Sequence, residues 1–254
     1  MFTFLINAIK IIFLLGFLVL IHEGGHFLVA RLCKVNVLEF SIGFGPKVFK
    51  KQGNKTLYSL RAIPLGGYVR LEGEDERSEK EGSFSEASIP KRMAIVLAGG
   101  LTNILFGIIV FFILATIIIN SVNQDSMLGN SMYLALIKTK DFIFSIFDSL
   151  KMLFTGRVSV NQFMGPVGIS QVISQTNGLQ DYIYMISLIS VSLGVTNLLP
   201  IPALDGGKFI LLVLEALRGK KLNERTEINI QLIGFAFLIT LSLYVAYNDI
   251  LRIL

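Results

Sequence analysis

Four long apolar runs dominate the pattern of hydrophobic and polar positions along this chain. A bilayer-spanning α-helix needs about 20 apolar residues, and each run is long enough to supply them. The third run is broken by prolines and glycines at 200–207, and a broken helix at membrane depth is tolerated where the freed backbone lines a cavity. The pattern therefore predicts an α-helical polytopic membrane protein with about four transmembrane helices, at about residues 4–32, 93–119, 182–217 and 228–247.

Three further segments have patterns of their own. Residues 35–71 alternate, with β-branched residues and Gly-rich corners, which predicts a small membrane-associated β-hairpin element. This element is either an ordinary surface hairpin or a strand edge that pairs with an extended peptide. Residues 133–156 combine charges with an apolar stripe, which is typical of an amphipathic helix lying in the membrane interface. The acidic stretch 72–86 predicts a solvated loop with no chemical role.

Composition and charge agree with a membrane protein and indicate its orientation. Hydrophobic residues make up 53% of the chain, which excludes an ordinary soluble domain. Lys and Arg are unevenly distributed, with twelve between residues 31 and 92 and only four between 121 and 181. By the positive-inside rule, the loops after the first and third spans are cytoplasmic and both termini face outward. The single cysteine, Cys33, excludes an internal disulfide, and the modest net charge of +5 does not indicate a nucleic-acid partner.

The first apolar run contains the sequence His22-Glu23-Gly24-Gly25-His26. The spacing H-E-x-x-H on a helix places both imidazoles on one face, where they can bind one Zn²⁺ at about 2.0–2.1 Å each. Glu23 is then positioned to take a proton from water at the metal. His22 and His26 are the only two histidines of the chain, and ionisable groups in hydrocarbon are costly enough to indicate function. The motif therefore predicts a zinc site inside the membrane, and Gly24 and Gly25 serve either to leave room near the metal or to pack helices closely.

A catalytic zinc usually has three protein ligands and an open fourth position. With no third histidine, the remaining ligand must be a carboxylate or Cys33. Asp205 is the acid lodged in the helix-breaking stretch of the third run, on the same side of the midplane as the motif, so we expect it to be the ligand. It could also cap the helix that restarts at Gly206, and the two roles are compatible.

Five motifs of the chain belong together: His22-Glu23-Gly24-Gly25-His26, Gly43-Phe44-Gly45-Pro46, Gly66-Gly67-Tyr68-Val69, Gly165-Pro166-Val167-Gly168 and the stretch from Asn197 to Gly207 that contains Leu204-Asp205-Gly206-Gly207. They resemble the site-2 protease family of intramembrane zinc metalloproteases, and are most similar to its bacterial regulator of sigma-E protease group. The resemblance covers nearly the whole chain.

The resemblance implies a zinc endopeptidase that hydrolyses peptide bonds in transmembrane segments of single-span substrates, such as anti-sigma factors and remnant signal peptides, in regulated intramembrane proteolysis. It implies a multi-pass protein of the bacterial inner membrane, with its active site towards the cytoplasmic side, and we expect a monomer. Carried over by motif position, Glu23 would be the general base and His22, His26 and Asp205 the zinc ligands. The substrate backbone would be held by Asn197 and by the β element, at Gly43, Phe44, Gly45, Gly67 and Tyr68.

The chain departs from the family pattern in two places. The family usually carries one or two PDZ domains between spans two and three, but the connector at 120–132 is far too short for one. We therefore expect a single membrane-embedded protease domain over residues 1–254. The family's A-G-P-x-x-N sequence on the second span reads Ala98-Gly99-Gly100-Leu101-Thr102-Asn103 here, and without its proline we expect altered helix curvature with unchanged chemistry. Asn103 serves either as interhelical glue or as support for the metal site.

Two other functions use the same residues. A membrane zinc carrier or sensor would bind metal without hydrolysis, so Glu23→Gln would keep both metal and activity. A zinc peptidase of the prenyl-protein-processing kind would take its third ligand from a glutamate in a later helix, and Glu215 is the buried candidate for that ligand.

Overall fold

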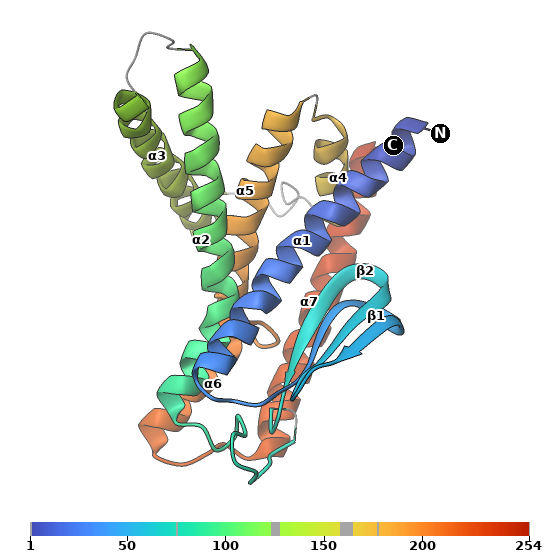
Figure 1. Cartoon of the computed structure of the whole chain (residues 1–254), viewed down its shortest axis with the longest axis vertical. Helices are drawn as coiled ribbons and strands as arrows, with labels where there is room; N and C mark the ends of the chain where they lie inside the picture. Colours follow the sequence, from blue (N-terminus) through green and yellow to red (C-terminus); the bar gives the residue numbers. More distant parts are fainter. Residues whose placement is uncertain (1, 75, 123–127, 158–164, 177, 254) are drawn as a thin grey trace. The chain divides into compact units, whose positions relative to one another are not determined.

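The computed structural model describes residues 2–74, 76–122, 128–157, 165–176 and 178–253. The backbone forms two compact units, Met1–Asn103 with Leu193–Leu238, and Ile104–Ser192 with Ile239–Leu254. The elements in chain order are α1 (Phe2–Leu32), β1 (Val37–Gln52), β2 (Leu57–Leu71), α2 (Ile89–Val122), α3 (Leu128–Phe154), α4 (Pro166–Ser174), α5 (Leu179–Asn197), α6 (Asp205–Arg218) and α7 (Glu224–Ile253) (Figure 1).

Four helices in the described part of the chain are long and apolar enough to cross a membrane: α1, α2, α5 and α7. Their mean hydropathy ranges from 1.2 to 2.7, yet only 11–22% of the residues in these windows are buried within the protein. Large apolar side chains such as Leu28, Leu105 and Ile117 are more than half exposed. A water-soluble protein rarely exposes so much continuous apolar surface, whereas lipid covers it at no cost. The prediction of a polytopic membrane protein with about four transmembrane helices is confirmed.

The third apolar run forms two helices, α5 and α6, separated by a turn at 198–204. α6 has 14 residues. At about 1.5 Å per residue, such a helix is too short to cross a hydrocarbon layer of about 30 Å. The turn is packed closely, because a Cβ on Gly207 would lie only 2.6 Å from the carbonyl carbon of Ile201. Gln231 of α7 accepts a hydrogen bond from the backbone N–H of Ala203, at 2.5 Å. The interruption of the third apolar run is therefore a well-packed turn, and it places Asp205 at the start of α6.

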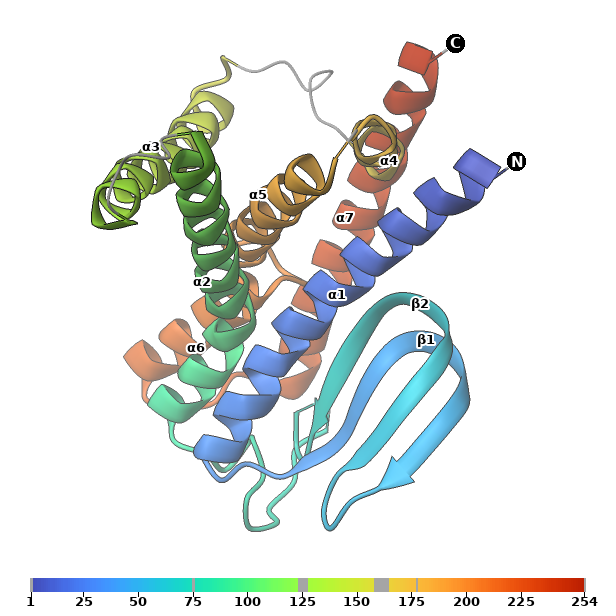
Figure 2. The same ribbon diagram turned by 45° about the horizontal axis from the view of Figure 1, so that its top comes forward.

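β1 and β2 form one long antiparallel hairpin that curls back on itself beside α1 (Figure 2). Phe40 has Cα partners on both sides, Val69 and Tyr58, so residues 39–42 lie between 57–60 and 67–70. The bend falls at Gly43 and Gly45, whose φ angles of +85° and +82° are favoured only for glycine. Within the described residues, 67–70 has partners on one side only, which leaves it as an edge.

A buried carboxylate, that of Glu39, ties the curled hairpin together. Its Oε1 accepts hydrogen bonds from Ser59 at 2.7 Å and from Arg61 at 3.1 Å, and lies 2.9 Å from Nζ of Lys47. Burial raises the pKa of Glu39, but the hydrogen bonds from Ser59, Lys47, Arg61 and Tyr68 outweigh it and lower the pKa to about 2. The carboxylate is therefore ionised at every physiological pH.

An apolar core joins the root of the hairpin to the end of α1, the start of α2 and α6. It includes Ala30, Val37, Leu71, Ile95 and Leu212, each less than 5% exposed. This core lies within the unit that also contains the two histidines of α1 and Asp205 of α6. It therefore fixes the positions of the elements from which the candidate site is built.

In the other unit, α3 packs through an aromatic cluster. The ring of Phe142 stacks on that of Phe111 at 4.2 Å, and Tyr184 of α5 lies against both. α3 is not among the candidate spans, and many of its apolar residues, including Phe147, are exposed. The helix predicted at 133–156 thus exists as Leu128–Phe154, while its placement in the membrane interface stays a prediction. Residues 123–127 of the predicted connector at 120–132 lie outside the described residues.

Candidate metal centre

Three side-chain atoms from α1 and α6 meet in a tight triangle. Nε2 of His22 and Nε2 of His26 are 3.3 Å apart, and Oδ2 of Asp205 lies 3.2 Å from the first and 3.4 Å from the second. Zinc holds such ligands tetrahedrally at about 2.0–2.1 Å, so two ligand atoms of one ion are separated by about 3.3–3.4 Å. The three distances therefore have the size of a zinc ligand triangle.

The hydrogen bonds around this triangle also fit a metal ion. His26 donates from Nδ1 to the carbonyl oxygen of Ile95 on α2 at 2.8 Å, which leaves the lone pair of Nε2 pointing into the triangle. Oδ2 of Asp205 is buried and has no hydrogen-bond partner in the described part of the chain. A buried carboxylate oxygen without a partner is costly, and a cation at the centre of the triangle would satisfy it. The donor set of two imidazoles and one carboxylate is one that Zn²⁺ prefers.

Asp205 faces the imidazoles and does not cap α6. Leu204 occupies the N-cap position, with no side-chain capping bond, and Asp205 lies in the first turn. A negative charge is still favoured there by the helix dipole. The other two candidates for the third ligand are placed elsewhere. Glu215 is buried against Arg92, with hydrogen bonds of 2.5 and 3.1 Å, and Cys33 lines a different cavity.

The glycines around the motif have distinct roles. A Cβ on Gly25 would lie 2.6 Å from the carbonyl oxygen of Ala98, so this glycine allows close packing of α1 on α2. Gly24 has nothing within 4 Å of where its Cβ would be. Room for the imidazoles is instead made by Gly99 of α2, where a Cβ would overlap Nε2 of His26. This role of Gly99 was not predicted from the sequence, although three small residues in a row at 98–100 indicate that another element approaches α2 closely there.

A cavity of about 190 Å³ opens beside the triangle. Glu23 lines it together with the two histidines, Asp205, and Tyr68 and Val69 from the edge of the hairpin. The carboxylate of Glu23 has a hydrogen-bonding interaction with the backbone of Val69. An ionisable carboxylate is thus held next to both the ligand atoms and an open space.

Only some of the predicted substrate-binding residues lie at this cavity. Tyr68 lines the cavity, and Gly67 is close to Glu23, with only 3.5 Å between its would-be Cβ and Cγ of the glutamate. The hairpin bend at Gly43, Phe44 and Gly45 is not part of the cavity lining, and neither is Asn197 at the end of α5.

An ion pair not predicted from the sequence lies at the rim of this cavity. Nζ of Lys208 on α6 is 2.7 Å from Oε1 of Glu74, and both side chains line the cavity. Together with Asp205 they also line a second cavity of about 620 Å³ between α6 and the start of α7. Glu74 belongs to the acidic stretch 72–86, for which no chemical role was predicted, and the ion pair joins this stretch to α6 at the edge of the cavity.

Comparison with known proteins agrees with this geometry. The model of peptidase family M50 matches residues 10–241. Two proteins named "putative zinc metalloprotease" are 30% identical to the chain. The one from Clostridium acetobutylicum aligns over 96% of this chain and 97% of its own length, and the one from Fusobacterium nucleatum over 99% of each. The zinc metalloprotease RasP of Shouchella clausii is 25% identical, over 93% of this chain and 96% of its own.

The alignments also show that the relatives are longer. The alignment with the Clostridium acetobutylicum protein has 329 positions, whereas the chain has 254 residues, so at least 75 positions are gaps in this chain. The family match nevertheless covers both histidines, Glu23 and Asp205. The chain belongs to peptidase family M50, the site-2 protease family, and is a membrane zinc metalloprotease.

Proposed function

We propose that this metalloprotease is an endopeptidase that cleaves within transmembrane segments of single-span substrates, with anti-sigma factors and remnant signal peptides as the expected classes. His22, His26 and Asp205 hold the zinc ion, and Glu23 is the general base. The observation that carries the proposal is the ligand triangle, formed between α1, a candidate membrane span, and the short helix α6. A ligand set on a lipid-embedded helix serves substrates that are themselves in the membrane.

When bound, zinc supplies a Lewis acid that polarises a carbonyl group and lowers the pKa of water to about 7. Glu23 takes one proton from the attacking water on its carboxylate and delivers it to the nitrogen of the leaving amine. The carboxylate is oriented for this by the hairpin, since Val69 and Gly67 lie against it. Its position on the wall of the cavity gives it access to water there.

The hairpin edge supports binding of an extended substrate. A peptide bond inside a helix is shielded by the helix, so the substrate segment must unwind before it is cut. In the part of the chain that the structure describes, residues 67–70 have strand partners on one side only, and Tyr68 and Val69 of this edge line the cavity. An unwound segment can pair its backbone with this edge, which satisfies its N–H and C=O groups within the membrane.

The test uses purified protein in nanodiscs with a panel of single-span substrates and a soluble protein substrate as control. We expect wild type to bind one zinc per chain and to cut inside the transmembrane segments. Glu23→Gln should retain zinc and lose cleavage, and Asp205→Ala should lose both. Cleavage retained in Glu23→Gln would refute Glu23 as the general base, and zinc binding by the wild type without cleavage would indicate a carrier or sensor. Cleavage of the soluble substrate alone would refute the intramembrane assignment.

The orientation is a separate part of the proposal. We expect an inner-membrane protein with the site towards the cytoplasm and both termini outside, because Lys and Arg concentrate between residues 31 and 92. We also expect a monomer. Cys33 is the single cysteine and lies just after the first span, so it reports on sidedness. A membrane-impermeant maleimide should label it in inverted vesicles and not in intact spheroplasts. The opposite result would reverse the topology.

A further inference from the structure

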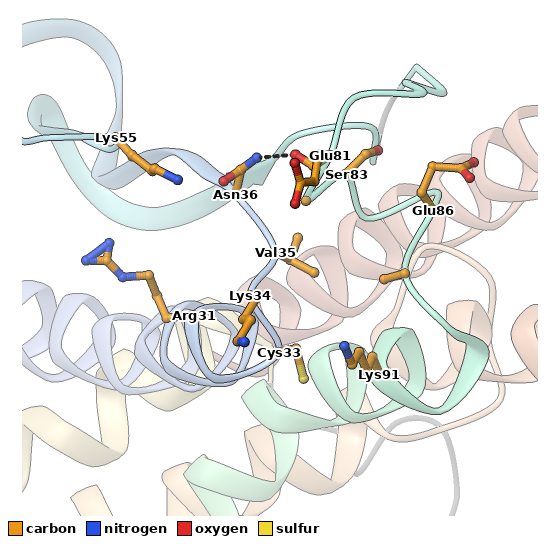
Figure 3. Close-up of a pocket in the computed structure, with 12 residues that line it drawn as sticks. Arg31, Cys33, Lys34, Val35, Asn36, Lys55, Glu81, Ser83, Glu86 and Lys91 are labelled. Carbon is orange, nitrogen blue, oxygen red and sulfur yellow. Dashed lines mark hydrogen bonds between the residues drawn. The ribbon is translucent and has the colours of Figure 1, made fainter.

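A cavity in the Met1–Asn103 unit is basic and shares no lining residue with the cavity at the metal centre. It measures about 670 Å³ and lies where α1 ends and α2 begins (Figure 3). Four cationic side chains line it: Arg31 and Lys34 at the end of α1, Lys55 from the hairpin turn, and Lys91 from the first turn of α2. None of the four has an ion-pair partner within the described residues.

The acids near the cavity do not neutralise these cations. Two acids, Glu81 and Glu86, line it, and Glu86 is paired with Lys221 at 2.8 Å. Gathering like charges around one hollow is unfavourable unless an anion occupies it. The four cations therefore face the carboxylate of Glu81 and that of Glu86, which is already paired with Lys221, so the net charge around the cavity is positive.

The wall of the cavity is held in place by hydrogen bonds between segments far apart in sequence. Asn36 donates from its backbone N–H to the carbonyl of Gly82 at 2.8 Å and from Nδ2 to the carbonyl of Glu81 at 2.9 Å. Lys34 has a φ of +62°, a left-handed conformation that glycine or asparagine adopts more easily. Such a conformation is common where a helix ends, and here the N–H of Val35 donates to the carbonyl of Ala30 at 2.9 Å to close the end of α1.

The position of the cavity in the membrane identifies the source of the anion. The candidate spans of α1 and α2 end at Leu32 and begin at Ile89, so the cavity lies at the membrane–water boundary. One turn deeper along α1, on the face of Arg31, Leu28 is 60% exposed, and Leu32, the residue after Arg31, is 81% exposed. A phosphate group in the cavity and an acyl chain along these leucines would belong to one molecule.

We propose that this cavity binds the phosphate group of an anionic phospholipid, with Arg31, Lys34, Lys55 and Lys91 around the headgroup. Basic pockets between the ends of transmembrane helices recognise such headgroups, and each cation near the surface contributes about 1 kcal/mol, which corresponds to about fivefold in affinity. The site is independent of the zinc centre and does not depend on the substrate class proposed above.

Cys33 lines the same cavity and provides the measurement. The full chain is reconstituted in nanodiscs of phosphatidylcholine alone or of phosphatidylcholine and phosphatidylglycerol in equal parts. The rate of Cys33 alkylation by a soluble maleimide is then compared. We expect phosphatidylglycerol to slow alkylation of the wild type, and we expect the Lys34→Gln, Lys55→Gln, Lys91→Gln triple variant to lose at least about tenfold of this lipid affinity.

Matched variants separate a specific site from general surface charge. The triple variant Lys50→Gln, Lys51→Gln, Lys220→Gln removes the same number of exposed cations away from the cavity and should be protected like wild type. Arginine at positions 34, 55 and 91 should also preserve protection. Equal loss of protection in the control triple variant, or no effect of phosphatidylglycerol on wild type, would overturn the proposal.

A further arm distinguishes a lipid from a free anion. Inorganic phosphate is added to the phosphatidylcholine nanodiscs, and we expect it to protect Cys33 only weakly, because it makes no contact along Leu28 and Leu32. Protection equal to that by phosphatidylglycerol would show a free-phosphate site and refute the lipid assignment. Native mass spectrometry should find phosphatidylglycerol retained by wild type and lost in the cavity triple variant.

Discussion

Gly99 provides a direct test of how the metal centre is built, because it lies outside the H-E-x-x-H motif. In Gly99→Ala, the new methyl group would overlap Nε2 of His26 and lie only 2.7 Å from Cε1 of His22. Carbon atoms in favourable contact are about 3.5–4.0 Å apart, so the imidazoles would have to retreat by about 1 Å. Ligand distances in zinc sites lie within about 0.2 Å of their usual values, so a shift of this size takes the imidazoles out of range. We therefore expect the variant to lose its metal.

The expected cost to the fold is much smaller than the cost to the metal. Overpacking by one methyl group destabilises the fold by about 1–3 kcal/mol. Replacing glycine by alanine in a helix interior stabilises it by about 1 kcal/mol, which offsets part of that cost. The protein should therefore remain folded. Disturbing the groups that orient metal ligands lowers affinity by about 10–100-fold, and direct displacement of an imidazole should reach at least the upper end of that range.

The assay is competition for zinc with a chromophoric chelator, read together with the thermal midpoint and cleavage of a single-span substrate. Gly24→Ala is the matched control, because nothing lies within 4 Å of its new methyl group even though it is inside the motif. We expect Gly24→Ala to bind zinc like wild type. Folded Gly99→Ala with wild-type zinc affinity, or equal loss of zinc in Gly24→Ala, would refute the packing argument.

Three further predictions concern charged residues outside the metal centre. The pKa of Glu39, lowered to about 2, implies about 3 kcal/mol of stability that is fully present above pH 4.5 and lost as pH falls towards 2. Denaturation experiments should therefore find Glu39→Gln less stable than wild type at neutral pH, with a free energy of unfolding that does not change between pH 4.5 and 2. Arg92→Met alone should cost about 3–5 kcal/mol because it leaves the Glu215 carboxylate buried and unpaired, whereas Arg92→Met with Glu215→Leu should recover most of the loss. Lys34→Gly should raise the free energy of unfolding by about 1 kcal/mol, by relieving the left-handed conformation, while weakening protection of Cys33 by phosphatidylglycerol.

Each of these predictions has an outcome that contradicts it. For Glu39, the reasoning fails if the wild type and the glutamine variant lose stability in parallel on acidification. For the buried pair, two single variants whose effects simply add would show that Arg92 and Glu215 do not depend on each other. For Lys34, a glycine variant that is less stable than wild type would mean that the lysine side chain contributes more to the fold than its strained backbone costs.

The helices and the histidine pair could be predicted because their determinants are local. An apolar run of sufficient length specifies a spanning helix, and the i, i+4 spacing of His22 and His26 fixes their relation once the helix forms. Asp205 is distant in sequence but could be singled out, because few acids occur in apolar stretches. The histidine pair and Asp205 stand out for the same reason, because an ionisable group in an apolar segment is costly and therefore indicates a functional site.

Residues whose roles depend on tertiary contacts could not be predicted in this way. Arg92 marks the start of an apolar run, where a basic residue is ordinary, yet it is buried against Glu215, 123 residues later. Glu74 is one of seven acids between residues 72 and 86, and nothing in the local pattern separates it from the others. Its pairing with Lys208 at the rim of the cavity depends on how that loop packs against α6.

The hairpin shows why a correct strand prediction still left its function open. Alternation of side chains reports which face of a strand is buried, but it does not report which backbone groups have partners. Only the register shows that 39–42 is paired on both sides while 67–70 is paired on one. Because Tyr68 and Val69 of that edge line the cavity beside Glu23, the unpaired edge is where an unwound substrate segment can find backbone partners within reach of the general base. The substitution Val69→Pro removes the backbone N–H of Val69 both from this edge and from the carboxylate of Glu23. It should therefore impair cleavage while leaving zinc affinity unchanged, and unimpaired cleavage in that variant would argue against a role of this edge.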